Sequence, residues 1–294
     1  TERRVEVLFA DPDGTIRGVE AVRPDGGRET VGCARLILAC NGYGGNREML
    51  RRHMPAISEA IYFGHDGNRG DAILWGEALG AATKHLGAFQ GHGNVAHPHG
   101  ILISWAVIME GGVQVNLEGR RFWNETQGYS EAAAAVLAQP DGMAWAIYDE
   151  RIAGIARQFV DFQDAETQGA VLWADSFAEL AEKTKLPDAE LAATMAHIET
   201  GDCPFGRAFD PAQRLNPPSA ATRVTGTLCH TQGGLDVTGD GQVKRQDGGL
   251  FPNLYAIGGA AVGVSGSGDA GYLSGNGLLS AVVLGRKAGL AGQS

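Results

Sequence analysis

Short apolar runs separated by turn signals open the chain. Residues 5–10 and 16–22 flank a D-P-D-G turn and predict a β-hairpin. A third apolar run, residues 33–40, predicts another strand that ends in a glycine-rich turn. After this turn Asn46 can cap a helix that continues to Leu50. The pattern is therefore a strand, a glycine turn and a helix start.

Helical spacing then dominates the middle of the chain. Apolar positions in residues 71–86 predict a helix, in which Gly80 would allow close packing against a neighbour. From about residue 92 to residue 228 the composition shifts towards Ala, Gln and Trp. Further helices are predicted at 130–137, 149–159 and 176–184, with another capped by Asp188.

A β-like pattern resumes after Asn216-Pro217-Pro218. Short strands are predicted around Val237 and at 242–243 and 254–257, and a helix at 276–290 closes the chain. A strand-rich module is thus interrupted by a helical insertion, which predicts an α+β or α/β fold.

Composition narrows the class of protein. The chain has 294 residues, 44% hydrophobic and 20% charged, which excludes a disordered or fibrous chain and suggests two domains. Lys and Arg number 24 against 34 Asp and Glu, so the net charge of −10 argues against a nucleic-acid partner. Because no apolar run approaches the roughly 20 residues of a membrane span and no signal-peptide pattern opens the chain, we expect a soluble, cytoplasmic protein.

Cysteine and glycine usage adds two expectations. The four cysteines form no C-x-x-C pair and lie near no histidine cluster, so we expect no metal site and reduced, core-type thiols. Forty-four glycines are about twice the usual share and indicate close backbone approaches to a flat or anionic ligand. Residues 266–271 match G-x-G-x-x-G, but the predicted strand lies well upstream and no acidic residue follows at the expected distance. This stretch predicts an irregular glycine loop.

Five separated stretches carry the recognisable motifs. They are L-I-L-A-C-N-G at 36–42, G-D at 70–71, Q-G-H at 90–92, V-N-x-x-G-x-R-F-x-N-E at 115–125, and a last block with H-T-x-G-G at 230–234, L-Y-A-I-G at 254–258, S-G-N-G-L-L at 274–279 and L-G-R at 284–286. In this order the stretches resemble the flavoprotein family of fumarate reductase and succinate dehydrogenase, which includes 3-ketosteroid and tricarballylate dehydrogenases. The resemblance implies an FAD-dependent oxidoreductase.

The resemblance also implies a domain layout. Members of the family begin with a strand, a G-x-G-x-x-G turn and a helix that bind the FAD pyrophosphate, and this chain starts downstream of them. We therefore expect the C-terminal portion of a longer flavoprotein. The remainder of a Rossmann-like FAD-binding domain would comprise residues 1–90 and 228–294, and an inserted, mostly helical capping domain residues 91–227. The alternative is a non-catalytic fragment unable to hold FAD alone.

Cofactor contacts follow from the same resemblance. The residues carried over are Ala39, Asn41, Gly42, Asp71, Gly258, Gly259, Gly275, Asn276, Gly277, Leu278 and Leu279. The S-G-N-G turn that enters the last helix would stabilise an anionic reduced flavin through its N–H groups and the helix dipole, by roughly 0.5 to 2 kcal/mol. An ordinary glycine-rich helix start is the alternative. Gly258-Gly259 stands where the family has Gly-Glu, so one expected ribityl contact is missing.

Two histidines flank the predicted insertion. His92 and His230 match the substrate-binding histidines of the reductases, and the resemblance places both at the mouth between the domains. An imidazole can donate a hydrogen bond to a carbonyl or carboxylate oxygen and raise its electrophilicity. Each histidine taken alone would more often be structural.

Departures from the reductases concern their charged residues. Tyr129 stands at the position of the proton-donating arginine and Tyr272 at that of a substrate-clamping arginine, while Trp105 and Ile108 replace the proton-relay glutamate and arginine. Bidentate carboxylate recognition requires arginine, so these departures argue for a neutral carbonyl substrate.

The stretch 271–275, G-Y-x-S-G, resembles that of ketosteroid dehydrogenases. It implies that Tyr272 and Ser274 polarise a carbonyl, that Tyr129 exchanges a proton, and that flavin N5 exchanges a hydride with a carbon adjacent to the carbonyl. A cyclic ketone or enone would be the substrate, with an unidentified electron donor or acceptor; a fumarate- or tricarballylate-type reaction is the alternative. Tyr129 is otherwise a helix-entry aromatic residue that packs on Trp123.

An apolar stretch completes the predicted site. Trp105, Ile108 and Met109 would line an apolar pocket for a ring substrate, or residues 101–109 form a buried strand.

Overall fold

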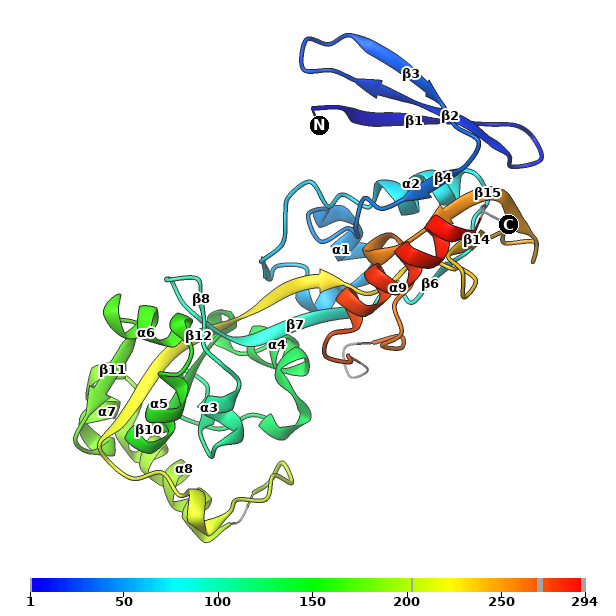
Figure 1. Ribbon diagram of the computed structural model, residues 1–294. Helices are drawn as coiled ribbons and strands as arrows, with labels where there is room; N and C mark the ends of the chain where they lie inside the picture. Colours follow the sequence, from blue (N-terminus) through cyan, green and yellow to red (C-terminus); the bar gives the residue numbers. More distant parts are fainter. Residues whose placement is uncertain (1, 202, 269–271, 292–294) are drawn as a thin grey trace. The chain divides into compact units, whose positions relative to one another are not determined.

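Two compact units make up the chain. The computed structural model describes residues 2–201, 203–268 and 272–291 (Figure 1). The terminal unit contains Thr1–Ser58, Tyr62–Gln90 and Cys229–Ser294, and the middle unit contains Glu59–Ile61 and Gly91–Leu228. Two strands, β7 (Phe89–Ala96) and β12 (Ser219–Thr231), carry the chain from one unit to the other. The roles predicted for the two parts, FAD binding and capping, stay predictions.

The terminal unit opens with an antiparallel sheet of three strands. They are β1 (Arg4–Ala10), β2 (Ile16–Val22) and β3 (Arg28–Gly32), in this order. The predicted hairpin is confirmed. The strand predicted at 33–40 is wrong in extent, because β3 ends at Gly32 and a separate strand, β4 (Leu36–Leu38), joins another sheet. Asn253 bridges this change of sheet, since its Nδ2 donates to the carbonyl oxygens of Ile16 and Ala34.

A mixed sheet forms the core of the terminal unit. Its order is β14 (Gln242–Lys244), β15 (Leu250–Ala256) and β4, with β15 and β4 parallel. Leu38 of β4 and Leu254 of β15 belong to the buried core of this unit. Beyond β4, the side chain of Asn46 accepts a hydrogen bond from Met49 N and caps α1 (Arg47–His53), as predicted. The glycine-rich turn therefore connects the end of β4 to the start of α1.

The second helix is shorter than the sequence predicts. Helix α2 spans Asp71–Ala78 and not residues 71–86. Gly80 has a φ of +82°, and an added Cβ would meet nothing within 4 Å, so this glycine reverses the chain and does not serve close packing. The chain continues into β6 (Thr83–Lys84), which pairs with β13 (Gly234–Leu235).

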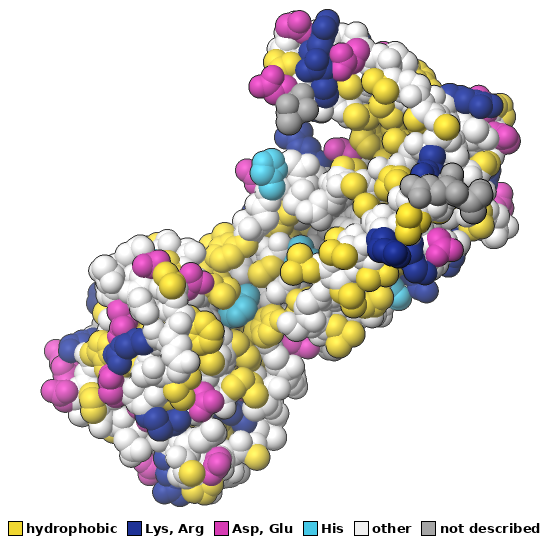
Figure 2. Space-filling model, in the orientation of Figure 1, with side chains coloured by type: hydrophobic (Ala, Val, Ile, Leu, Met, Phe, Trp, Pro, Cys, Tyr) yellow, Lys and Arg dark blue, Asp and Glu magenta, His cyan; other side chains and the backbone are white. Residues whose placement is uncertain are grey.

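The last helix, α9 (Asn276–Leu290), has the predicted bounds. It contacts the single turn η5 (Gly258–Ala260) and strand β15. One face of the helix is apolar and exposed, with Leu278 at 79%, Leu279 at 60% and Val282 at 70% exposure. Figure 2 shows hydrophobic side chains gathered over this part of the unit. A surface helix normally turns such a face towards a core.

The middle unit is built on a sheet in the order β8-β7-β12-β10-β9, with β5 and β11 also paired to β12. The remaining strands are β5 (Ile61–Tyr62), β8 (Ile101–Leu102), β9 (Val113–Val115), β10 (Met143–Asp149) and β11 (Val171–Ala174). Most of these strands escaped the sequence analysis. The reason is visible in β10, where Ala144 to Asp149 are all buried, so no alternation of apolar and polar residues marks the strand.

Helices pack around this sheet. They are α3 (Ala106–Met109), α4 (Tyr129–Leu137), α5 (Glu150–Ala156), α6 (Val160–Thr167), α7 (Phe177–Thr184) and α8 (Asp188–Thr200), with the single turns η2 (Glu125–Gln127), η3 (Pro140–Gly142) and η4 (Pro211–Gln213); η1 (Pro55–Ile57) lies in the terminal unit. The helices predicted at 130–137, 149–159 and 176–184 exist, although α5 ends at Ala156. Asp188 does not cap α8, because it is the first helical residue and follows Pro187. The buried strand considered for 101–109 is wrong: β8 covers two residues and α3 follows.

Three expectations about composition can be compared with the described residues. Cys33, Cys40, Cys203 and Cys229 are all free, but Cys40 is exposed and the other three are half-buried, so the prediction of core-type thiols is wrong. None of the helices in the described ranges has the length and apolar character needed to cross a bilayer. The described part of the chain also holds no cluster of three or more His, Cys, Asp or Glu side chains suited to a metal ion.

Candidate flavin site and two aromatic–histidine clusters

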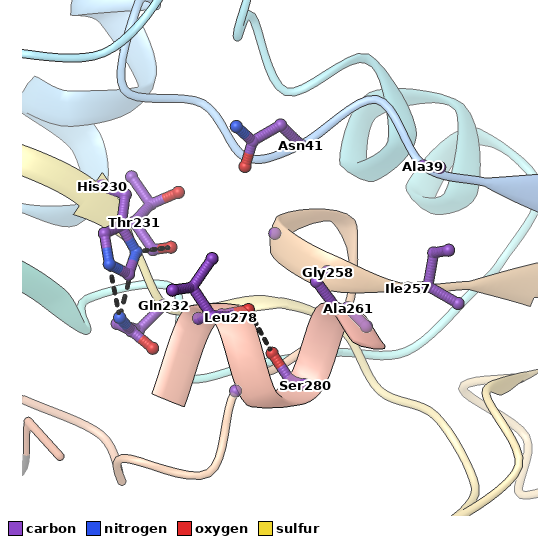
Figure 3. Close-up of a pocket in the computed structure, with 14 residues that line it drawn as sticks. Ala39, Asn41, His230, Thr231, Gln232, Ile257, Gly258, Ala261, Leu278 and Ser280 are labelled. Carbon is purple, nitrogen blue, oxygen red and sulfur yellow. Dashed lines mark hydrogen bonds between the residues drawn. The ribbon is translucent and has the colours of Figure 1, made fainter. Parts of the chain in front are cut away.

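A pocket of about 470 Å³ lies in the terminal unit, between the turn after β4, the end of β12, the turn after β15 and the start of α9 (Figure 3). Its lining residues are Ala39, Asn41, His230, Thr231, Gln232, Ile257, Gly258, Gly259, Ala261, Gly263, Gly277, Leu278, Ser280 and Ala281. None of these lining residues is Lys, Arg, Asp or Glu. The pocket therefore suits an uncharged ligand part that carries hydrogen-bonding groups.

Glycines bring backbone segments into contact at the base of this pocket. A Cβ on Gly42 would collide with Thr231 Oγ1, and a Cβ on Gly259 would collide with Asn41 Oδ1. Asn41 itself has a φ of +65°, in the left-handed region. Its Oδ1 accepts a hydrogen bond of 2.9 Å from Gly42 N, and Tyr43 N donates to Thr231 Oγ1 at 3.2 Å. The turn after β4 is thus tied to the end of β12.

Helix α9 points its first turn at the pocket. The residue before it, Gly275, has a φ of +80° and provides no side-chain cap. The first N–H groups of a helix have no partner within the helix, and the helix dipole makes this end positive. Since Gly277 and Leu278 line the pocket, uncapped N–H groups lie at its wall. This wall favours an acceptor atom or a developing negative charge.

A polar network supports His230 beside the pocket. Gln232 Nε2 lies 3.0 Å from His230 Nδ1 and 3.3 Å from His230 Nε2. Asn276 Nδ2 donates to Gln232 Oε1 and Ser265 Oγ, and Asn276 Oδ1 accepts from Val264 N at 3.2 Å. The His230 ring meets the Tyr272 ring edge-on, at 6.3 Å between centroids and 77° between planes. Burial lowers the pKa of His230, although the Thr231 carbonyl opposes the shift.

The middle unit holds a second aromatic–histidine cluster. Tyr129 stacks on His92 at 5.2 Å and 26°, and Trp105 meets the same imidazole edge-on at 5.8 Å and 88°. His92 is 6% exposed, and burial lowers its pKa to about 4. Its Nδ1 accepts a hydrogen bond of 3.2 Å from Asn94 N. Tyr129 thus packs on His92, whereas the ring that Trp123 approaches is that of Trp105, at 6.2 Å.

Trp105 carries an orphaned polar atom. Its indole Nε1 is buried and has no hydrogen-bond partner among the described residues. By contrast, Trp123 Nε1 donates to Gln114 Oε1 at 3.1 Å. A buried donor without a partner costs about 1 to 3 kcal/mol, so such a group points to an acceptor supplied from outside the chain.

The structure brings only some of the predicted cofactor residues together. Ala39, Asn41, Gly258, Gly259, Gly277 and Leu278 line the pocket with His230. Gly42 lies behind it, buried against Thr231. Gly275 and Leu279 are exposed near the start of α9 and do not line the pocket, and the side chain of Asn276 turns into the polar network. Ser274, predicted as a catalytic residue, is likewise exposed there and does not line the pocket. Asp71 lines a different pocket, of about 450 Å³, which shares Ala39 with the first.

One predicted pocket residue, Ile108, is placed wrongly. Ile108 is fully buried, and its carbonyl accepts a hydrogen bond from Arg207, so it does not line a substrate pocket. Met109 is 52% exposed at the end of α3. Burial of Ile108 follows from its place on α3, which packs on α5 and β10. In the stretches 266–271 and 271–275, residues 269–271 lie outside the described residues.

The sequence analysis missed Gln232 and Ser265. Gln232 occupies the unspecified position of the H-T-x-G-G stretch, where its amide faces His230. Its polarity beside a candidate histidine was the available signal. Ser265 gives no comparable signal, because its hydroxyl meets Asn276 only through the fold.

The chain is similar to proteins of known family. Residues 1–278 match the FAD binding domain family. The chain is 30% identical over 291 residues to a probable fumarate reductase of Shewanella frigidimarina, covering 97% of this chain and 48% of that protein. It is 29% identical over 277 residues to a 3-oxosteroid 1-dehydrogenase of Mycobacterium tuberculosis, covering 79% of this chain and 48% of that protein. The chain thus spans about half the length of these relatives.

Solved structures show the same fold. An open conformation of a flavocytochrome c3 fumarate reductase matches with a TM-score of 0.78 and 28% identity, over 98% of this chain and 51% of that one. A 3-ketosteroid-Δ4-(5α)-dehydrogenase of Rhodococcus jostii matches with a TM-score of 0.73 and 24% identity, over 98% of this chain and 59% of that one, which shows the fold alone. The resemblance and the mixed α/β fold class inferred from the sequence are confirmed. The chain belongs to the FAD binding domain family, and its relatives include a probable fumarate reductase and a 3-oxosteroid 1-dehydrogenase.

Proposed function

We propose that this chain serves a dehydrogenase or reductase that acts on a cyclic ketone or enone. The observation that carries the proposal is the packing of each histidine against a tyrosine ring, with His92 buried and His230 half-buried. Burial lowers the pKa of His92 to about 4 and also lowers the pKa of His230, and each imidazole packs against a tyrosine. Neutral donors of this kind suit a carbonyl oxygen, whereas a carboxylate calls for arginine.

The residues of the pocket fit a flavin ring. Glycine positions keep side chains out of the pocket, and its lining residues carry no charge. FAD, when bound, would supply N5 as the hydride acceptor or donor for the carbon β to the substrate carbonyl, while the proton is exchanged at the α-carbon. The N–H groups at the start of α9 would stabilise negative charge there.

Each cluster receives a role in the reaction. In the terminal unit, Tyr272, Ser274 and the His230 imidazole would donate hydrogen bonds to the carbonyl oxygen, which makes the neighbouring C–H bond more acidic. In the middle unit, the Tyr129 hydroxyl would exchange the proton of that bond, held in place by its stacking on His92. The indole N–H of Trp105 would bind a further substrate oxygen.

A fumarate-type carboxylate reaction is the second candidate. The relatives described above favour it, because one at 30% identity is named a probable fumarate reductase. Against it, the buried guanidinium groups of Arg121 and Arg207 are already engaged by Glu125.

Anaerobic flavin reduction separates these candidates. A saturated cyclic 3-ketosteroid should bleach the oxidised flavin of the FAD-loaded protein, and fumarate should fail to reoxidise the reduced flavin. Reoxidation by fumarate without bleaching by any cyclic ketone would establish the carboxylate reaction instead.

Tyrosine variants test the assigned roles. Tyr129→Phe and Tyr272→Phe should each slow flavin reduction by the ketone about 100-fold or more, since general acid–base groups contribute on this scale. Tyr255→Phe, on strand β15, is the matched control and should leave the rate unchanged. Unchanged rates in both site variants would remove the tyrosine mechanism.

A third possibility is that the chain binds no FAD by itself. Strand β4 lies at an edge of its sheet, and the 450 Å³ pocket with Leu36 and Trp75 opens beside it. The visible spectrum of the purified chain decides. Flavin absorbance supports the proposed cofactor site, and a colourless protein that takes up no added FAD contradicts it.

A further inference from the structure

A chain of hydrogen bonds in the terminal unit runs from a backbone N–H to the imidazole of His230. It passes from Val264 N through the amides of Asn276 and Gln232, and Figure 3 shows its last step at the pocket wall. Asn276 is 2% exposed and Gln232 is 4% exposed, so both amides are held by the protein. The donor and acceptor of each hydrogen bond in this series can be assigned from the end whose donor is known.

The known donor is a backbone N–H. Val264 N–H can only donate, and it lies 3.2 Å from one end of the Asn276 amide. That end must be the oxygen, because an NH₂ group cannot accept a hydrogen bond from N–H. The other end of Asn276 is then the NH₂ group, which faces Gln232 and Ser265 Oγ.

The same logic sets the second amide. Since Asn276 donates, the group of Gln232 that it contacts must be the oxygen. Gln232 consequently turns its NH₂ group towards His230, 3.0 Å from Nδ1 and 3.3 Å from Nε2. A donor at the nearer nitrogen requires that Nδ1 be unprotonated.

The competing arrangement is less favourable. His230 Nδ1 also lies 3.4 Å from the Thr231 carbonyl oxygen, to which a protonated Nδ1 could donate. In that arrangement the ring would depend on two longer contacts, 3.4 Å to Thr231 O and 3.3 Å from Gln232 to an unprotonated Nε2, in place of the 3.0 Å contact to Nδ1. A doubly protonated ring leaves the NH₂ group of Gln232 no acceptor, so Gln232 acts in the same direction as burial.

The Cε1–Nε2 edge of the ring faces the start of α9. A Cβ on residue 277 would lie 3.0 Å from His230 Cε1 and 3.4 Å from Nε2. Gly277 therefore leaves this edge uncovered beside the pocket. Tyr272 is the titratable group in ring contact with the imidazole.

We propose that Gln232, oriented by Asn276, is a positioning residue that holds His230 as a neutral imidazole with its hydrogen on Nε2. The imidazole then offers one N–H donor to the pocket and carries no charge. Its use for a carbonyl oxygen of the substrate rests on the function proposed above, but the tautomer does not.

The test is a direct reading of the tautomer. Long-range ¹H–¹⁵N correlation spectra of the ¹⁵N-labelled, FAD-loaded protein distinguish protonated from unprotonated imidazole nitrogens. The His230 signals are those lost in His230→Gln. Without substrate at neutral pH we expect Nε2 protonated and Nδ1 unprotonated, and a ring protonated on Nδ1 overturns the proposal.

Two variants of Gln232 show whether this residue sets the tautomer. In Gln232→Glu the carboxylate still accepts from Asn276 but also accepts from the ring, so the hydrogen should move to Nδ1 and the pKa of His230 should rise by about one to two units. In Gln232→Met no donor remains, and both neutral tautomers should appear. Gln246→Glu, whose Nε2 donates to Ala81 O elsewhere in the unit, is the matched control. An unchanged His230 tautomer in both Gln232 variants would contradict the positioning role.

The proposed function is tested separately in the same samples. Addition of 4-androstene-3,17-dione as a cyclic enone probe should shift the Nε2 signal, and addition of fumarate should not. If the free protein has the expected tautomer and only fumarate shifts the signal, the carbonyl substrate is wrong while the role of Gln232 stands.

Discussion

Two tryptophans in the middle unit differ in the hydrogen bonding of their indole N–H groups. Trp123 Nε1 donates to Gln114 Oε1, whereas Trp105 Nε1 is buried without a partner among the described residues. Gln114 is itself fully buried, so loss of the Trp123 donor would orphan an acceptor. Loss of the Trp105 donor would leave no described acceptor without its hydrogen bond.

This contrast gives a prediction for Trp105→Phe and Trp123→Phe. We expect Trp123→Phe to lower the free energy of unfolding by about 2 kcal/mol more than Trp105→Phe does. Urea titration of the two variants checks the difference. In the FAD-loaded protein, Trp105→Phe should weaken binding of the cyclic enone about five- to tenfold through the lost hydrogen bond. Equal destabilisation by both variants would mean that Trp105 also holds a structural bond.

Burial of His92 makes stability depend on pH. The pKa of this imidazole falls from 6.5 to about 4 in the folded chain, so between these pH values the unfolded state binds a proton that the folded state does not. Stability should therefore drop as the pH falls through this window, by up to about 3 kcal/mol, and the contribution should level off below it.

Unfolding free energies at pH 7 and pH 4 check this dependence. The difference should shrink in His92→Gln and remain in His99→Gln, which removes an exposed imidazole of the same unit. An unaltered pH dependence in His92→Gln would assign the effect to other groups.

At the scale of elements, a buried ion cluster joins segments distant in sequence. Glu125, at the start of η2, binds Arg121 before it and Arg207 in the segment that follows α8. Arg207 also donates to the carbonyl oxygens of Ile108 and Gly112, both at 2.9 Å. The R-F-x-N-E part of the family-like motif thus has a structural use, in holding α3, β9 and this segment together.

We therefore expect Glu125→Gln to lower the free energy of unfolding strongly. Two buried guanidinium groups would share a neutral amide, and breaking a buried pair costs about 3 to 5 kcal/mol. Glu190→Gln is the control, because its pair with Arg120 is exposed and should matter by less than about 1 kcal/mol. Thermal unfolding of the two variants makes the comparison, and similar losses would show that the cluster contributes little.

The elements divide into those that local sequence could predict and those that it could not. The β1–β2 hairpin has an explicit turn, α1 has Asn46 as its cap, and α9 has a clear helical pattern, so all three were found. Strand β10 and most of β12 are buried on both faces and show no alternation, so they were missed. Helix α2 is shorter than its apolar pattern predicts, because Gly80 adopts a left-handed conformation and the helix ends before it.

At the scale of the whole molecule, the candidate site could be predicted in part. The order of the motifs predicted Asn41, Gly277 and His230 as site residues, and these three residues line one pocket. It could not show that the Asn276 side chain supports Gln232, since that depends on contacts between residues far apart in sequence. Asp71, carried over as an FAD contact, lines a second pocket that shares Ala39 with the first, so its role stays a prediction.

The exposed apolar face of α9 affects how the molecule behaves in solution. Exposed apolar patches promote association, and Val282 is 70% exposed on this face. We expect Val282→Lys to reduce self-association of the chain at a given concentration, as measured by light scattering. Ala192→Lys adds the same charge at an exposed position of α8 and should have a smaller effect. Equal effects would point to net charge as the cause.

The bare first turn of α9 has a thermodynamic consequence. With glycine before it and no side chain to cap it, this end of the helix frays more readily than one that carries a Ser or Asp cap. A bound molecule that accepts these N–H groups completes the helix, so occupancy of the pocket and order at the carboxyl-terminal end of the fold become one linked equilibrium. Loss of the cofactor would then unfold this end of the helix locally, well before the sheets of this unit come apart.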